Sequence, residues 1–359
     1  MPKPTPQPVT ARLTTPAQMV ASMPLWLGYV PTRSLVVACL HEPRGRVGLT
    51  LRFDLPPEEV EQDLVEEAVT RVAHQRPTRV LVAVYTDEPD DRRKRARGAL
   101  VEQLCDELCD ALPGLLVTEA VLVRDDRFFS YLCDDVRCCP AEGTAVSAGR
   151  EDAPVQLLEA EQVLRGQVVL PDRDALARTL SGPRLPAAEE ARQGCARAQH
   201  RHREERAQGR EAWRERWLAR WSEAVVGPAD GGGRLDTQEA AHLVMTLEDV
   251  LLRDALVAEH EPDELLPLLR ELMRMTPEPY DAAVCTVFAW TAYCDGGGAE
   301  VTIALERALR TDPAYSLAGL LTEVMLGQVP PATVRAVTRE ASPARAARRR
   351  ARRSRPSRG

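Results

Sequence analysis

The chain has 359 residues and a formal net charge of −7, and with 44% hydrophobic and 28% charged residues it has the composition of a globular protein large enough for two domains. No apolar run reaches the roughly 18 residues of a membrane span, and the first residues lack the apolar core of a secretory signal. We therefore expect a cytoplasmic protein without membrane contact, whose nine cysteines are thiols or metal ligands.

The first part of the chain alternates between strand and helix patterns. Residues 1–10 are proline-rich and predicted to be disordered. Over residues 11–182 the alternation predicts an α/β domain with a mixed sheet, an N-terminal β-hairpin and flanking helices. The predicted elements in chain order are a short helix from Pro16, strands 34–41 and 46–55, a helix opening at Pro56, strand 79–87, a helix over 91–112, strand 115–125 with a further short strand after it, and short helices in the 150s and over 171–180.

A long charged segment follows, and residues 183–230 are predicted to form one connector helix. Its first half has no apolar stripe, so His200 and His202 are expected to be solvated. Trp213, Trp217 and Trp221 recur every four residues and share one helical face. We expect this helix to dock through its tryptophans.

Helical patterns fill residues 231–331. The joint between Ala308 and Pro313, a helix followed by an Asp-Pro stop and a new helix, is similar to that of a tetratricopeptide (TPR) helix pair, although no 34-residue period recurs. The sequence therefore predicts an all-α, TPR-like module that offers a groove to a protein partner. Residues 332–359 are predicted to be a basic, disordered tail.

Distinctive motifs are spread over most of the chain. They are LTTPAQMVASMPLWLGYVPTRSLVV at 13–37, LRFDLP at 51–56, FFSYLCDDVRCCPAEGT at 128–144, RDAL at 253–256, WTAYCDGGGA at 290–299 and LRTDPAYSLAGLL at 309–321. Together, and in this order, they resemble a largely uncharacterised actinobacterial family, domain of unknown function 4192. The resemblance implies an α/β front domain and a helical end, and it implies no activity.

Cys133, Cys138 and Cys139 form a C-x4-C-C pattern in a polar loop. Thiolates suit zinc, which needs a fourth donor, but the spacing differs from the C-x2-C pair of zinc ribbons. The remote candidates for that donor are Cys105, Cys109, His74 and His41. Three alternatives stay open: thiols packed as apolar groups or paired by oxidation, a zinc site, and a reactive thiol. The pattern favours the first, and the cofactor is unknown.

Acidic side chains follow several predicted strands, namely Asp54, Asp87, Asp125 and Asp126. Ligands of open α/β sheets bind at the carboxyl ends of strands. If the strands are parallel, some of these acids converge on a metal or act as acid and base. The competing interpretation is that aspartate simply caps helices and begins turns.

The predicted hairpin carries possible anion ligands at one end. Arg33, Ser34 and Arg52 flank the hairpin, with Asp54 beside them, and Gly28 of the LGYVP loop completes the candidate site. An arginine fork is suited to anions. The alternative is a tight turn in which Ser34 satisfies backbone groups and Arg52 faces solvent.

Three functions remain in view. Catalytic signatures such as the P-loop and the G-x-S-x-G elbow are missing, which favours a ligand- or protein-binding regulatory factor over an enzyme that uses Asp54 and Asp87.

Residues 344–359 hold eight arginines and no acid, and taking these charges from −7 leaves −15 for the rest of the chain. This tail is able to make nonspecific contacts with nucleic acid. The alternative is a disordered, solvated end, or one that folds back on the acidic remainder of the chain. The arginines singled out for the nucleic-acid contact are Arg348, Arg349, Arg350, Arg352 and Arg353.

Overall fold

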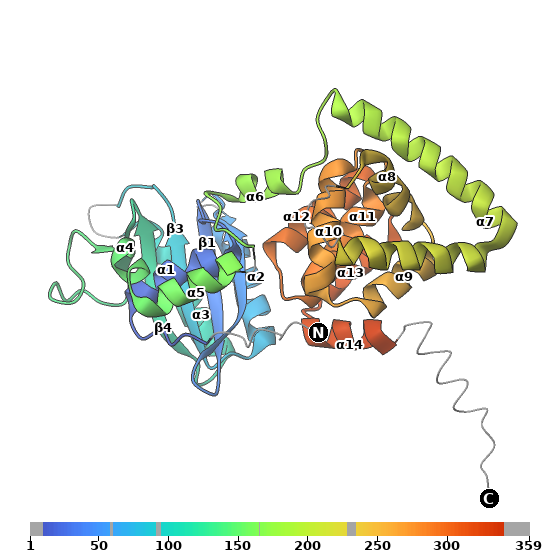
Figure 1. The fold of residues 1–359 in the computed structure, drawn as a ribbon. Coiled ribbons are helices and arrows are strands. Elements are labelled where there is room, and N and C mark those ends of the chain that lie inside the picture. The colour runs from blue at the N-terminus through green and yellow to red at the C-terminus, as the bar shows by residue number, and fades with distance from the viewer. Residues whose placement is uncertain (1–9, 58–59, 91–94, 165, 228–234, 341–359) are drawn as a thin grey trace, which may run out of the picture. The chain divides into compact units, whose positions relative to one another are not determined.

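The computed structural model describes residues 10–57, 60–90, 95–164, 166–227 and 235–340. Its contacts divide the chain into two compact units, Met1–Ala175 and Leu176–Gly359 (Figure 1). The first contains a sheet with helices, and the second contains helices. Among the described helices, none combines the length and the apolar composition that a transmembrane span requires.

A six-stranded mixed sheet organises the first unit, which confirms the predicted α/β class. Its strands are β1 (Ser34–His41), β2 (Arg46–Asp54), β3 (Arg79–Tyr85), β4 (Leu116–Arg124), β5 (Arg127–Ser130) and β6 (Thr144–Ala145). They lie in the order β2-β1-β3-β4-β5-β6. The hairpin β1–β2 and the pair β1–β3 are antiparallel, whereas β3 and β4 are parallel. The three segments predicted to lie side by side, β1, β3 and β4, therefore do so.

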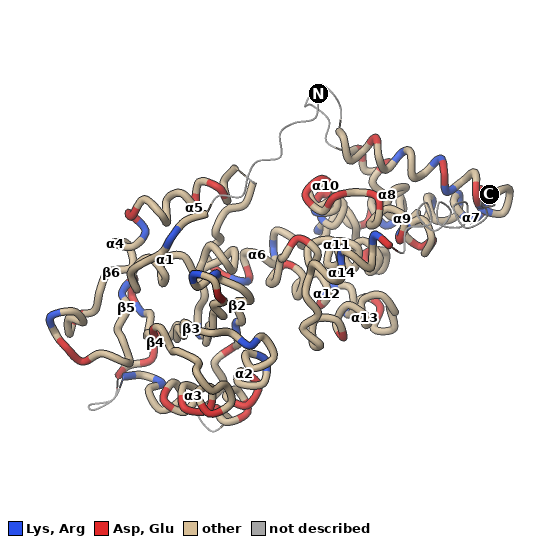
Figure 2. The backbone as a smooth tube through the Cα atoms, turned by 90° about the horizontal axis from the view of Figure 1, so that it is seen from below, with Lys and Arg blue, Asp and Glu red and all other residues tan. Residues whose placement is uncertain are grey.

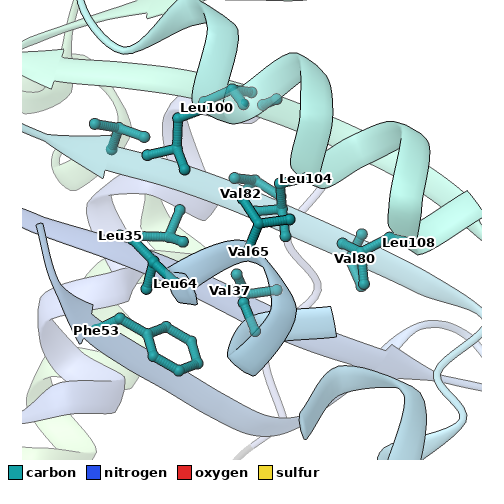
Figure 3. Close-up of a cluster of buried hydrophobic side chains, with 14 of the residues drawn as sticks. Leu35, Val37, Phe53, Leu64, Val65, Val80, Val82, Leu100, Leu104 and Leu108 are labelled. Atoms are coloured by element: carbon teal, nitrogen blue, oxygen red, sulfur yellow. The ribbon is translucent and has the colours of Figure 1, made fainter. Parts of the chain in front are cut away.

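Helices cover both faces of this sheet because the central strands are apolar on both sides. The helices of the unit are α1 (Pro16–Leu27), α2 (Glu61–Gln75), α3 (Gly98–Ala111), α4 (Val146–Arg150) and α5 (Ala153–Leu164). On one face, alternate residues of β1 such as Leu35 and Val37 pack against α2 and α3 (Figure 3). On the other face, Val36 and Ala38 pack in a cluster with residues of α1, α4 and α5. The sheet is thus the middle of three layers.

The second unit is helical. A short helix, α6 (Arg173–Thr179), crosses the boundary between the units. The others are α7 (Ala187–Val226), α8 (Thr237–Thr246), α9 (Val250–Glu259), α10 (Pro262–Met275), α11 (Ala282–Cys294), α12 (Ala299–Thr311), α13 (Ser316–Leu326) and α14 (Pro331–Glu340). The predicted helical character is confirmed, and the likeness to TPR pairs is not. Helix α14 occupies the start of the segment predicted to be a disordered tail.

The predicted connector helix, α7, consists of two helical arms joined at Gly209, where the backbone leaves the helical region (Figure 1). The second arm buries Trp213 and Trp221. The first arm buries a row of mostly small side chains at helical spacing. These are Ala188, Ala191, Cys195, Ala198 and His202. The first arm therefore has a packed face. The sequence pattern did not reveal it, because most of its residues are alanines, which give no strong apolar stripe.

His202 corrects a sequence prediction. It is fully buried rather than solvated, while His200 is exposed. The indole Nε1–H of Trp213 donates to His202 Nδ1 over 3.2 Å. Since that nitrogen accepts, the proton of the neutral ring is on Nε2, which lies 3.1 Å from both the carbonyl oxygen and Nδ1 of His242. Burial and the neighbouring His242 lower the pKa of His202 to about 4.

Arg307 joins four segments of the helical unit. Its Nε donates to Asp281 Oδ2 over 2.7 Å, and the Asp281 side chain is fully buried. The Thr311 hydroxyl donates to the other oxygen of Asp281 over 2.8 Å. Three backbone carbonyls accept the remaining bonds of the guanidinium, those of Leu180, Met273 and Thr276. The pair is thus ion-paired, and every guanidinium nitrogen and both carboxylate oxygens have a hydrogen-bond partner, as a stable buried charge requires.

Candidate functional site

The loop that joins β5 to β6 projects from the first unit and carries charged residues of both signs (Figures 1 and 2). Its two ends are held in place. At the start, the Tyr131 hydroxyl donates to the Ala96 carbonyl over 2.6 Å. At the end, Gly143 has a φ of 77°, and a Cβ there would lie 2.6 Å from the Phe129 ring, so a side chain would meet that ring. The Arg127 guanidinium of β5 donates to the Gly143 carbonyl over 2.8 Å, so the sheet holds the end of this loop.

A tight turn shapes the middle of the loop. The Asp135 carbonyl accepts hydrogen bonds from the backbone N–H groups of Cys138 and Cys139, at 3.0 and 2.8 Å. The Asp135 carboxylate pairs with Arg137 at 2.7 Å, and this pairing lowers the pKa of Asp135. The turn returns the chain towards Cys133 and brings cysteines from the two ends of the C-x4-C-C motif together.

The three predicted cysteines converge. The Sγ atoms of Cys133 and Cys138 lie 3.0 Å apart, those of Cys138 and Cys139 lie 3.7 Å apart, and all three fall within 4.8 Å of one another. Hydrogen bonds from the Cys138 thiol and from the backbone of Asp135 lower the pKa of the Cys133 thiol. The bond to Cys133 raises the pKa of Cys138, and burial above all raises that of Cys139 to about 12.

Within the described ranges, these cysteines are the one group of three or more histidine, cysteine, aspartate or glutamate side chains close enough to share a metal ion. The four remote donors considered from the sequence do not join this group. The carboxylates of Asp134 and Asp135 also lie outside it. Among the described histidine, cysteine, aspartate and glutamate side chains, none therefore completes a four-ligand set with these cysteines.

The predicted strand-end acids lie at the same end of the sheet, where β2, β3 and β4 end and β1 begins. Ser34, which begins β1, pairs with Asp54 at the end of β2 and with Tyr85 at the end of β3. Asp54 and Asp87 therefore flank the start of β1 without meeting in a cluster of three or more ligands in the described part of the chain. Asp125 and Asp126 form the turn between β4 and β5, both with positive φ. Acid/base chemistry at this end of the sheet stays a prediction.

Three of the four predicted anion ligands contact one another at this end of the sheet. Arg52 Nε donates to Ser34 Oγ over 2.8 Å, and Nη2 lies 2.6 Å from Asp54 Oδ1. The Ser34 hydroxyl donates to the carbonyl of Thr32 over 2.7 Å. Arg33 is exposed and takes part through its carbonyl, which accepts from the Leu55 N–H. This network ties the ends of β1 and β2, and anion binding by it stays a prediction.

Arg97 was not predicted from the sequence. Its side chain is 5% exposed, donates to both carboxylate oxygens of Glu88 over 2.6 Å, and also pairs with Glu61. The hydrogen bonds from Arg97 lower the pKa of Glu88. The residue stands in the run DEPDDRRKRAR, which has the composition of a solvated loop, so no local signal marks its burial.

The first unit also contains a cleft of about 320 Å³ between α1, α5 and residues 169–171. Its size falls at the lower end of the ligand-cleft range. The lining is mainly apolar and includes one basic and one acidic residue. These residues are Ala21, Pro24, Leu25, Val30, Arg150, Val155, Glu159, Val169, Leu170 and Pro171. No sequence motif predicted it.

Comparison with known proteins identifies the family of the chain. A family model described as a domain of unknown function (DUF4192) matches residues 16–332, which include the thiol loop and most of both units. Neither the curated proteins nor the solved structures contain a match. The five arginines predicted to contact nucleic acid, at 348–353, lie outside the residues that the structure describes.

Proposed function

The chain belongs to the DUF4192 family, and from this premise and the geometry of the thiol loop we propose that it is a zinc-binding regulatory protein. The single observation that carries the proposal is the convergence of Cys133, Cys138 and Cys139 within 4.8 Å on a loop whose end is held by β5. In this proposal the three thiolates hold one Zn²⁺, and the occupied loop presents a defined surface to a partner.

The sulfur spacing supports a common metal ion. With Zn–S bonds of about 2.3 Å, tetrahedral ligation separates sulfur atoms by about 3.8 Å. Cys138 and Cys139 are 3.7 Å apart, and Cys133 and Cys138 would move apart slightly from 3.0 Å. Because Cys133 and Cys139 are partly exposed and Cys138 is exposed, solvent and metal ions reach the group.

The rest of the loop supports a binding role. Leu132, which precedes the first cysteine, and Val136, which lies between Cys133 and Cys138, expose 53% and 69% of their surface. Apolar groups exposed beside a charged rim are typical of protein-contact sites.

Elemental analysis tests the proposal. The full chain, purified under reducing conditions, is expected to contain one Zn²⁺, and titration with Co²⁺ should produce one equivalent of thiolate-to-cobalt absorption. C133S and C138S should each weaken binding by at least tenfold. The matched control is C109S, which removes an exposed cysteine outside the group and should change nothing.

Two outcomes would overturn this function. The first is a wild-type chain without stoichiometric zinc that also fails to bind Co²⁺. The second is a C109S variant that loses as much metal as C133S, because the ligands would then lie elsewhere.

The nucleic-acid alternative has its own test, since it concerns a different part of the chain. If the arginine-rich tail contacts DNA, removal of residues 344–359 should abolish binding to heparin or duplex DNA at low salt. Retained binding would contradict that alternative and would leave the zinc proposal unaffected.

A further inference from the structure

The thiol loop has a second chemical capacity, which follows from the spacing of its sulfur atoms. We propose that Cys133 and Cys138 form a reversible disulfide when the protein meets a peroxide, and that this oxidation releases the metal. The inference deepens the proposed zinc function and rests on it for the release step, but the disulfide itself depends only on the two thiols.

Proximity selects the pair. The Sγ atoms of Cys133 and Cys138 are 3.0 Å apart, and a disulfide requires about 2.05 Å, so the two side chains need to approach by about 1 Å. Cys138 and Cys139 are poorer partners, because the Cα atoms of consecutive residues are about 3.8 Å apart and ordinary disulfides need at least about 4.4 Å.

Exposure makes this pair accessible to an oxidant. Cys138 is exposed, and Cys133 is partly exposed. By contrast, Cys39, Cys195 and Cys285 are buried. The oxidation is therefore expected to spare the buried cysteines, and Cys109, which is also exposed, lies outside the group of converging thiols. The polar, exposed middle of the loop can adjust without disturbing a packed core.

The chemistry balances with a peroxide as oxidant. One thiolate of the pair attacks a peroxide oxygen, the O–O bond breaks, and a sulfenic acid and hydroxide result. The second thiolate attacks that sulfur, the S–S bond forms, and the sulfenic oxygen leaves as hydroxide. In the metal-free protein the protons of the two thiols convert both hydroxides to water, and in the zinc-loaded protein, where both groups are already thiolates, the buffer supplies these protons. The thiols lose two electrons in total, and the peroxide gains them.

Metal release follows from the number of ligands. The disulfide removes two of the three thiolates, which leaves Cys139 as a single donor among the three. A single thiolate holds Zn²⁺ far more weakly than three, because each lost ligand is replaced by water. Reduction by a small dithiol restores the pair and the site.

The experiment uses the zinc-loaded full chain and hydrogen peroxide. We expect zinc release, followed with a chromogenic chelator, to proceed in parallel with a Cys133–Cys138 cross-linked peptide that is lighter by two hydrogens in mass spectrometry. C139S should still form this disulfide, whereas C138S should instead accumulate sulfenic or sulfinic acid at Cys133. C109S should behave like the wild type.

The outcomes separate the two proposals. A protein that binds zinc but gives no Cys133–Cys138 peptide overturns the redox inference and leaves the zinc function standing. A metal-free protein that still forms the disulfide overturns the zinc function and the release step, and it leaves this cysteine pair as a thiol switch. A cross-link found chiefly between other cysteines also contradicts the inference.

Discussion

The polar clusters of the two units differ in how their groups are satisfied. In the helical unit, Arg307 with Asp281 and His202 with Trp213 are buried, and their side-chain nitrogen and oxygen atoms have hydrogen-bond partners, so each group is fixed by its neighbours. On the thiol loop of the sheet unit, three like groups converge near the surface without a buried partner. The comparison teaches that the first arrangement stabilises a fold, whereas the second is suited to an external ligand.

The largest effect is expected at the buried ion pair. Arg307→Ala should lower the free energy of unfolding of the helical unit by about 3–5 kcal/mol, since it leaves Asp281 buried without its counter-charge. Urea unfolding followed by tryptophan fluorescence reports this unit, because four of the five tryptophans belong to it. The matched control is Arg310→Ala, whose side chain is 66% exposed, with an expected loss under about 0.5 kcal/mol. Equal losses of stability in the two variants would contradict the structural role given to the buried pair of Arg307 and Asp281.

A smaller, pH-dependent effect is expected at His202. Its folded pKa of about 4 lies below the ordinary value of 6.5, so the unfolded chain takes up a proton that the folded chain does not. Stability from this group is therefore complete above pH 6.5 and is lost as the pH falls towards 4, by at most about 1.4 kcal/mol per pH unit.

His202→Gln isolates this contribution, because glutamine does not titrate and can still accept from Trp213 and donate to His242. Urea midpoints measured between pH 7 and pH 5 should fall less steeply in this variant than in the wild type. His200→Gln, at an exposed position, should keep the wild-type slope. If both variants follow the wild type, His202 is protonated in the fold and the bonding scheme given for it is wrong.

The smallest effect on stability is expected on the thiol loop. In metal-free, reduced protein, Cys133→Ser and Cys138→Ser should each change the free energy of unfolding by less than about 0.5 kcal/mol, because neither side chain packs in a core. The same variants should lose zinc, so these substitutions should weaken metal binding while the stability of the metal-free protein stays almost unchanged. A loss above about 2 kcal/mol without metal would place these cysteines with the structural clusters and remove the contrast between the units.

Much of the architecture was predictable from local patterns. Alternation and apolar runs located β1, β3 and β4, and helical spacing located most helices, because backbone hydrogen bonding and burial impose those periods. The thiol site was also within reach, since its three cysteines lie within seven residues and one turn brings them together.

What the sequence determined by itself is therefore the class of each segment and the composition of the cysteine loop, because both depend on neighbours along the chain. The tertiary structure decided the rest. Arg307 meets Asp281 across 26 residues, and Arg97 meets Glu61 across 36. His202 contacts His242 of α8 across 40 residues, and the rings of Trp213 and Trp217 also pack against it. Such partners are determined by how helices and strands pack, and no local sequence pattern indicates which residues they are.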